Sequence, residues 1–438
     1  MTNEVAWVIS ANMGLGHQRA AYPLKDIAYE GIYLFGEEAI DSKKERLLWA
    51  MFRESYEFIS RTRNVPVFGH FLFSMLERLQ NISPYYPFRD LSQPSFQVKS
   101  LSFLIHRGLG EGLAKKLKTK RLPVIASFYA AAVAAEELTD LPVYSIICDA
   151  DINRVWVPEN PKSSRTIFFA PCGHTMRRLK QYGVPDERIF LTGFPLPKEN
   201  IGGPDMSILR HDLGKRLIRL DPTWRFRTIH GEEAKYYLGW DIREDKETYP
   251  LTITYTVGGA GAQAEIARDV LRSLTGKIKE GKVRLNLVAG VRPKVAEYFR
   301  EIIAKAGLAN HEGVQVIFQP LAKDYFADFS RILHTTDILW TKPSELSFYC
   351  GLGLPLVMAP CIGPHEVYNR QWLREIGAGI PQQDPRYAGE WLLDYLIDGR
   401  LAQAAWDGFL YARKMGTYKI EEILRTGTMQ REISPLKR

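Results

Sequence analysis

The sequence predicts an α/β protein made of two Rossmann-like domains that face one another across a cleft. Apolar runs of strand length alternate with helical patterns through both halves of the 438 residues, as in proteins built on parallel sheets. Each half also opens with a strand that runs into a glycine-bearing turn and then a helix, once near residue 10 and again near residue 257. The repetition of this opening indicates two separate sheets.

The first domain is predicted over residues 1–197. It opens with an apolar strand at 5–10 and a helical stretch at 18–29. Residues 41–121 are predicted to form a basic and apolar helical insert, because large apolar side chains recur at helical spacing. The insert's helices are expected at 43–60 and 68–81, later strands at 122–127, 142–149 and 166–170, and later helices at 130–138 and 174–182. Residues 188–195 close this first half.

The second domain is predicted over residues 251–385. Residues 198–250 precede it and are charged and aromatic with Pro and Gly breaks, which favours a linker with a helical lead-in. The tail at 386–438 is helical and aromatic-rich, and we expect it to pack back across both domains. Within the second domain, strands are predicted at 251–257, 285–289, 314–318, 338–341 and 356–359, with helices ending near 279 and spanning 293–306, 325–334 and 345–352.

The net charge of +8 is concentrated in one segment. Residues 41–121 contain fifteen Lys and Arg but seven Asp and Glu, so the rest of the chain is balanced. This segment is either a solvated basic face or a surface that meets anionic lipid or a phosphorylated acceptor. The helix at 68–81 is likewise either core-facing or a membrane-surface helix. Nucleic acid is not an expected partner, because no Arg/Lys-rich helix or RNA-binding signature accompanies the charge.

The sequence favours a cytoplasmic protein, with a peripheral position on the inner face of the membrane as a further expectation. The N-terminus has no basic region followed by a long apolar stretch, and no run reaches the ~18 apolar residues of a membrane span. None of the four cysteines is in CxxC spacing, which favours reduced thiols over a disulfide frame or a zinc site. These cysteines are Cys148, Cys172, Cys350 and Cys361.

The two glycine turns suit the oxygens of phosphates or sugars. Glycine lets the backbone approach a ligand closely, and the N-terminus of the following helix offers unpaired N–H groups and a partial positive charge. Simple packing of helix on strand also uses glycine. Having one such turn in the equivalent place of each half favours the ligand-binding interpretation.

Short motifs along the chain resemble one glycosyltransferase family. Residues 13–17, Met-Gly-Leu-Gly-His, resemble the Gly-Gly-Gly-His turn of monogalactosyldiacylglycerol synthases and the Gly-Gly-His turn of the transferase that makes lipid II. Residues 257–262 resemble the family's second glycine turn, and 341–343, 353–355 and 365–369 follow in the family's order. The likeness covers roughly 5–30 and 140–380. It implies the GT-B architecture of family 28-like glycosyltransferases.

The resemblance implies roles for residues in both halves. His17 would be the general base beside the acceptor hydroxyl, with Gly14 and Gly16 forming the turn near the acceptor and the donor diphosphate. A histidine that only caps the helix is the alternative. The donor residues implied are Gly258, Gly259, Gly261 and Gln263 for the phosphates, Leu321 for the nucleobase, His365 and Glu366 for the sugar, and Asn369 to support the last loop.

One position departs from the family pattern. The family places a Glu that holds the ribose hydroxyls where this chain has Phe348, and the turn before it reads Lys342-Pro343-Ser344-Glu345. Either Glu345, with Ser344 beside it, takes over the ribose contact, or donor binding differs.

Residues 149–151, Asp-Ala-Asp, match a pattern that elsewhere binds divalent metal. Such metal sites belong to another glycosyltransferase architecture, so no metal is expected here. Asp149 is instead predicted to contact the acceptor or to orient His17, with a plain role at the end of a strand as the alternative.

The implied function is that of a hexosyltransferase-type glycosyltransferase, inverting and metal-independent. It would move a sugar from a nucleotide donor, expected to be UDP-linked, to a lipid or lipid-linked acceptor, and it would need no other cofactor. Two alternatives stay open: a UDP-sugar epimerase of the same fold, and a non-catalytic protein that binds sugar nucleotides or lipid.

Overall fold

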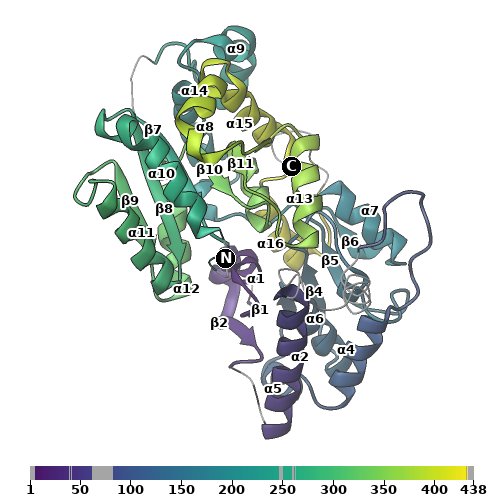
Figure 1. Ribbon diagram of the computed structural model, residues 1–438. Coiled ribbons are helices and arrows are strands. Elements are labelled where there is room, and N and C mark those ends of the chain that lie inside the picture. The colour runs from purple at the N-terminus through teal and green to yellow at the C-terminus, as the bar shows by residue number, and fades with distance from the viewer. Residues whose placement is uncertain are drawn as a thin grey trace. The chain divides into compact units, whose positions relative to one another are not determined.

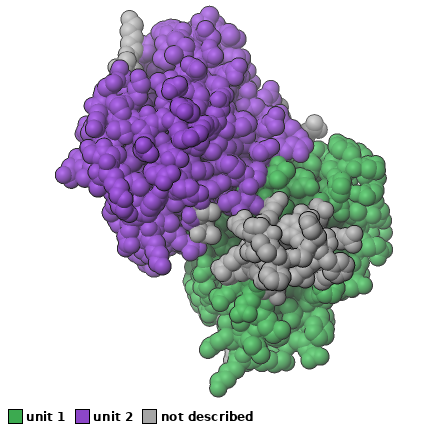
Figure 2. Space-filling view, in the orientation of Figure 1, with its two compact units in different colours: residues 1–195, 363–368, 415–431 green, residues 196–362, 369–414, 432–438 purple. Residues whose placement is uncertain are grey.

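The computed structural model describes residues 5–38, 40, 42–61, 82–245, 250–258, 261, 263–430 and 432. They form two compact units (Figures 1 and 2). Unit 1 comprises residues 1–195, 363–368 and 415–431, and unit 2 comprises residues 196–362, 369–414 and 432–438. Each unit is built on one six-stranded parallel sheet. The prediction of two Rossmann-like domains is therefore confirmed.

The sheet of unit 1 has the strand order β2-β1-β3-β4-β5-β6. All neighbouring strands are parallel, and β1 is buried along its whole length. The chain leaves β1 toward one edge to form β2 and then fills the sheet on the other side, so the winding direction reverses between β1 and β3. The strands are β1 (Ala6–Ala11), β2 (Ala28–Phe35), β3 (Val124–Ala126), β4 (Val143–Ile146), β5 (Ile167–Phe169) and β6 (Ile189–Phe190).

Small side chains let a helix lie close to this sheet. Helix α6 is buried from Tyr129 to Ala135, a stretch of alanines with one valine, and it contacts β1, β3 and β4. The helices of unit 1 are α1 (Leu15–Ala21), α2 (Lys43–Arg61), α4 (Phe96–His106), α5 (Glu111–Leu117), α6 (Tyr129–Leu138), α7 (Gly173–Gln181) and α16 (Gly416–Thr426), with 3-10 turns η1 (Tyr22–Ile27), η3 (Arg154–Trp156) and η4 (Asp186–Arg188).

The predicted helix at 18–29 is partly wrong. Helix α1 ends at Ala21, and Pro23 sits at the start of a 3-10 turn, where its fixed φ fits but a continuing α-helix would lose a hydrogen bond. The chain then forms β2, which was not predicted from the sequence. Within residues 188–195, which close the first half, the structure has a strand of two residues, β6. The predicted helix at 68–81 lies outside the described residues.

The sheet of unit 2 has the order β12-β11-β10-β7-β8-β9. Numbered within the unit, this is the doubly wound order 3-2-1-4-5-6, whose winding reverses between the first and fourth strands, here β7 and β10. All neighbouring strands are parallel. The strands are β7 (Leu251–Thr256), β8 (Val283–Gly290), β9 (Val314–Phe318), β10 (Ile338–Thr341), β11 (Leu356–Met358) and β12 (Gly379–Pro381).

Residues 198–250, predicted as a linker with a helical lead-in, differ from that expectation. They form η5 (Lys198–Asn200), α8 (Ser207–Leu220) and α9 (Arg225–Leu238), and α8 belongs to the core of unit 2. Arg216 of α8 is buried and donates hydrogen bonds to the carbonyl oxygens of Leu333, Thr336 and Leu352. Burial lowers the pKa of this guanidinium to about 10.

The C-terminal helices divide between the units. Helices α14 and α15 belong to unit 2, whereas α16 belongs to unit 1, and the first residues of α13 are counted with unit 1. None of the helices in the described ranges combines the length and the hydropathy of a membrane-spanning segment. The remaining helices of unit 2 are α10 (Ala264–Lys279), α11 (Pro293–Lys305), α12 (Ala322–Leu333), α13 (Pro364–Glu375), α14 (Ala388–Ile397) and α15 (Arg400–Tyr411), with 3-10 turns η6 (Glu345–Leu352) and η7 (Pro385–Tyr387).

Candidate functional site

The glycine turn of unit 1 lies where the winding of its sheet reverses. Gly14, with φ of 101°, precedes α1, and His17 lies in the first turn of that helix. Ser127 follows β3, the strand beside β1. Because parallel strands end at the same edge of a sheet, the two loops meet there, and Nδ1 of His17 lies 2.7 Å from the carbonyl oxygen of Ser127. Ligand sites in open α/β sheets occur at such reversals.

Ser127 fixes the ring of His17 and its backbone. A carbonyl oxygen only accepts, so Nδ1 must donate, and a neutral His17 therefore carries its lone pair on Nε2. The Ser127 hydroxyl also donates to the His17 carbonyl oxygen at 2.8 Å. Ser127 was not predicted as a site residue, because no local motif marks a backbone acceptor 110 residues away.

Aromatic rings and one thiol surround the half-buried imidazole of His17. The ring centroid of Phe128 is 5.0 Å away and that of Trp156 is 6.1 Å away. The Cys148 Sγ lies 3.8 Å from Nδ1 and also contacts the carbonyl oxygen of Ser127. An oriented neutral imidazole in such a setting can act as a base through Nε2.

Asp149 and Gly16 stay predictions as site residues. Asp149 is half-buried in the loop after β4, and its carbonyl oxygen accepts a hydrogen bond from the Thr175 hydroxyl at 3.0 Å. Gly16 is half-buried within the first turn of α1. Their positions at the same sheet edge as His17 are compatible with contact to an acceptor.

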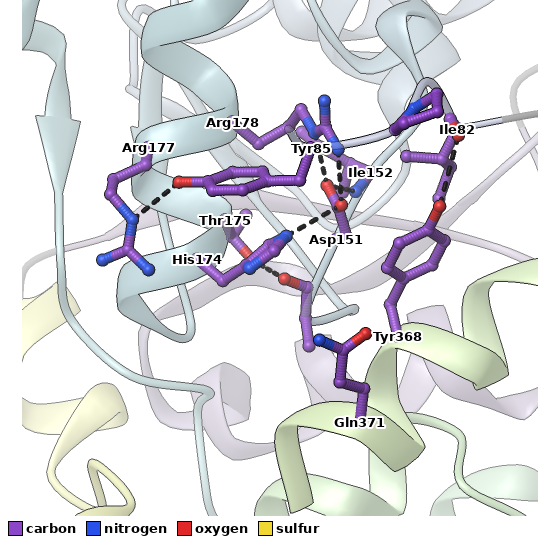
Figure 3. Close-up of polar contacts among 12 residues, drawn as sticks. Ile82, Tyr85, Asp151, Ile152, His174, Thr175, Arg177, Arg178, Tyr368 and Gln371 are labelled. Carbon is purple, nitrogen blue, oxygen red and sulfur yellow. Dashed lines mark hydrogen bonds and ion pairs between the residues drawn. The ribbon is translucent and has the colours of Figure 1, made fainter. Parts of the chain in front are cut away.

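Asp151, the second carboxylate of the Asp-Ala-Asp stretch, is committed to a buried ion pair (Figure 3). Arg178 binds both carboxylate oxygens at 2.8 Å, and His174 Nε2 lies 2.9 Å from Oδ2. The Ile152 amide donates to Oδ1. Burial raises the pKa of Asp151, but the bonds from Arg178 and His174 outweigh it and hold the pKa below its ordinary value. Within the described ranges, no group of three or more His, Cys, Asp or Glu is arranged to hold a metal ion.

Side chains of α7 in this cluster also contact the segment that begins at Ile82 (Figure 3). The Tyr85 ring lies 4.2 Å from the His174 ring, and the Tyr85 hydroxyl accepts a hydrogen bond from Arg177. Arg178 also donates to the Ser83 carbonyl oxygen at 2.8 Å. The cluster therefore explains Asp151 as a structural residue.

The glycine turn of unit 2 also lies at a reversal of winding. Gly258 follows β7, and Lys342 follows β10, the neighbouring strand. A Cβ atom at Gly258 would come within 2.7 Å of Lys342 Cε. The φ of Gly258 is not positive, so the turn does not require glycine, and a side chain there would displace the flexible end of Lys342. Lys342 belongs to a motif noted in the sequence, but it was not predicted as a site residue.

The start of α10 is held in place by two hydrogen bonds. Gln263, with φ of 68°, caps the helix, and its side chain donates to the Pro360 carbonyl oxygen at 2.8 Å. Its own carbonyl oxygen accepts from the Tyr255 hydroxyl at 2.7 Å. Gly261 takes a φ of 77° in the turn, and Gly259 lies outside the described residues. Contacts of Gly261 and Gln263 with phosphates stay predictions.

Phe348 is a core residue of unit 2. Only 2% of it is exposed, and its ring centroid lies 4.9 Å from that of Trp372. The position where the glycosyltransferase family that the motifs resemble places a Glu is therefore apolar and filled in this chain. Glu345 is the half-buried first residue of η6, and Ser344, which is buried, precedes it. A ribose contact by either one stays a prediction.

The remaining predicted donor residues occupy two other places. Glu366 is buried in the first turn of α13, where a carboxylate interacts favourably with the helix dipole, and His365 beside it is half-buried. Asn369 of the same helix is fully buried. Leu321 caps α12 with 53% of its surface exposed. The described contacts do not test these assignments.

Comparisons with known proteins found one family model and a set of solved structures of low sequence identity. A family model described as a domain of unknown function (DUF6938) matches residues 295–419. No curated protein sequence matches the chain. The solved structures that match include a Staphylococcus aureus MnaA–UDP co-structure, at 12% identity and a TM-score of 0.47, covering 98% of this chain and 99% of the other.

MurG and the glycosyltransferase SnogD are also among the similar solved structures. MurG of Acinetobacter baumannii matches with 15% identity and a TM-score of 0.46, over 96% of this chain and 99% of the other. The glycosyltransferase SnogD from Streptomyces nogalater matches with 11% identity and a TM-score of 0.46, over 97% and 100%.

Proposed function

We propose that this protein is an inverting, metal-independent glycosyltransferase that uses a nucleotide-sugar donor, UDP-linked, and a lipid or lipid-linked acceptor. The observation that carries the proposal is the position of the two glycine turns. Each lies at the reversal of winding in its own sheet, where open α/β sheets bind ligands. In each case a chemically suitable side chain lies beside it: His17 in unit 1 and Lys342 in unit 2.

The reaction needs a base for the acceptor hydroxyl and a binding site for the leaving diphosphate. As the hydroxyl oxygen bonds to the anomeric carbon, its proton passes to His17 Nε2, and the bond from that carbon to the diphosphate oxygen breaks. The contact between His17 and Ser127 supports this role, because it orients the ring and leaves Nε2 as the basic nitrogen. Backbone N–H groups at a helix N-terminus can stabilise the diphosphate.

The outer face of α4 supports a lipid acceptor. Phe96, Lys99, Phe103, His106 and Arg107 are exposed at positions that share one face of this helix, and α4 contains no acidic residue. The Arg107 guanidinium lies 5.0 Å from the Phe103 ring centroid. A mixture of aromatic and cationic side chains suits the interface of an anionic membrane. This helix lies within the basic segment 41–121.

A panel of nucleotide sugars tests the function directly. We expect one UDP-sugar to be hydrolysed slowly by the purified protein, and the rate to fall about 100- to 10,000-fold in His17→Ala with donor affinity retained. The matched control is His211→Ala, which changes an exposed histidine of α8 in unit 2.

Other results would favour the other two functions. Inversion at C2 of free UDP-GlcNAc would favour an epimerase. If the protein binds none of the nucleotide sugars in the panel, the result would favour a non-catalytic protein over a glycosyltransferase.

A further inference from the structure

The end of the Lys342 side chain lies close to the backbone of Gly258. A lysine buries its aliphatic stem against its neighbours and keeps its ammonium group toward water or an anion. Here Lys342 is half-buried, and its terminal carbons lie so close to Gly258 that a Cβ atom at position 258 would displace the flexible end of the lysine. Glycine at position 258 therefore lets the lysine keep this position.

The place of this pair in the sheet indicates a ligand of negative charge. Gly258 and Lys342 follow β7 and β10, the two strands between which the winding reverses. Helix α10 begins at Ala264, and a helix N-terminus carries a partial positive charge that also favours an anion.

We propose that Lys342 binds the diphosphate of the nucleotide donor and stabilises it as a leaving group. The inference rests on the function proposed above and names a residue that supplies positive charge. When the anomeric carbon–oxygen bond breaks, its electron pair stays on the diphosphate oxygen, and the negative charge of the diphosphate increases. An ammonium group at this place binds the diphosphate before the bond breaks and binds it more strongly afterwards.

The proposal makes Gly258 and Lys342 one functional element. Replacing Gly258 with Ala keeps an allowed backbone conformation but places a methyl group 2.7 Å from the present position of Lys342 Cε. The lysine must then move away from its position, although its charge is kept. Gly258→Ala and Lys342→Met should therefore weaken the same interaction by different routes.

Isothermal titration of UDP and uridine into the full-length protein tests this. We expect Lys342→Met to lower UDP affinity about 10- to 100-fold and to leave uridine affinity unchanged, since uridine has no phosphate. Lys342→Arg should keep part of the affinity for UDP. The control is Lys305→Met, which removes an exposed lysine at the far end of α11 and should change neither affinity.

The double variant decides whether the two residues act together. Gly258→Ala should lower UDP affinity at least about tenfold, and the double variant should bind UDP no more than about twofold more weakly than Lys342→Met alone. If the fold-losses in UDP affinity of the two single variants multiply in the double variant, Gly258 and Lys342 act independently and the proposed coupling is wrong.

Two outcomes separate this proposal from the function it rests on. If Lys342→Met binds UDP within twofold of the unchanged protein, or loses uridine and UDP affinity equally, the assignment of Lys342 is wrong and the proposed function stands. If the unchanged protein binds no nucleoside diphosphate from a panel of UDP, dTDP, GDP and ADP, the assignment of Lys342 and the proposed function are both wrong.

Discussion

The Nδ1 atom of His17 lies 2.7 Å from the carbonyl oxygen of Ser127, so a backbone group of one loop sets the proton position on a side chain of another. These loops follow β1 and β3, which are adjacent strands. The orientation of the imidazole is therefore built into the sheet and depends on a backbone oxygen.

This contact predicts a mild effect of changing the Ser127 side chain. Ser127→Ala removes the hydroxyl bond to the His17 carbonyl oxygen but keeps the backbone oxygen that holds the ring. We expect kcat to fall less than about tenfold, against about 100-fold or more in His17→Ala. Turnover of the donor identified in the nucleotide-sugar panel measures both. Equal losses in the two variants would mean that Ser127 does more than orient the ring.

Asp151 should contribute strongly to stability. Asp151→Asn leaves the buried Arg178 without its countercharge, and we expect the free energy of unfolding to fall by about 3–5 kcal/mol. The matched control is Asp186→Asn, which breaks an exposed pair with Lys180 of the same helix, α7, and should cost less than about 1 kcal/mol. Urea unfolding measures both. A similar small loss in both variants would contradict a structural role for the cluster.

The same carboxylate predicts how that difference depends on pH. The pKa of Asp151 is lowered from 3.8, so its contribution is fully present above the pKa of the unfolded chain and is lost as pH falls through the folded pKa. The gap in stability between the unchanged protein and Asp151→Asn should be constant between about pH 5 and pH 8 and should shrink below about pH 4. A gap that widens in acid would show that the pKa is shifted in the opposite direction.

Introducing a carboxylate at position 348 should damage the fold. Phe348→Glu places a charged group where 2% of the residue is exposed and removes its contact with Trp372. We expect a loss of at least about 3 kcal/mol in the free energy of unfolding and no gain in UDP affinity. Glu345→Gln is the comparison, because Glu345 is half-buried and its replacement should change stability little. A stable Phe348→Glu protein with tighter UDP binding would contradict this account.

The face of α4 predicts binding to anionic vesicles. Co-sedimentation should occur with phosphatidylglycerol vesicles, weaken with added salt, and be weak with phosphatidylcholine vesicles. The change Lys99→Glu should lower the partition coefficient at least about fivefold. Adding Phe103→Ser to that variant should lower the partition coefficient further. The control is Ile229→Ser, which changes an exposed apolar residue of α9 in unit 2. Equal binding to anionic and neutral vesicles would show that the face of α4 is not a surface for anionic lipid.

The sequence predicted most of the sheet because parallel strands are buried on both faces. Strands such as β10 and β11 are short buried apolar runs, and their predicted limits agree with the structure to within one residue. The strand β2 was missed because it lies at the edge of its sheet, is only partly buried, and includes Glu30 and Gly31 at positive φ. Its sequence therefore lacks the continuous apolar run of a central strand.

The site was predictable where its residues lie in one turn and not where they meet across the sheet. His17 and Gly258 sit in glycine turns that can be recognised locally. Ser127 and Lys342 reach them from neighbouring strands, and only the strand order brings each pair together. The burial of Phe348 also depends on Trp372 of a later helix, which no local pattern reveals.

The division of the chain affects how the protein can form during translation. Unit 1 includes residues 415–431, and Gly416 lies so close to the Phe194 carbonyl oxygen that a side chain there would collide with it. The ribosome makes these residues after nearly all of unit 2. The first 195 residues must therefore wait, with one helix missing, until almost the whole polypeptide has emerged, and a gene fragment that stops near residue 195 would produce a protein with an uncovered surface.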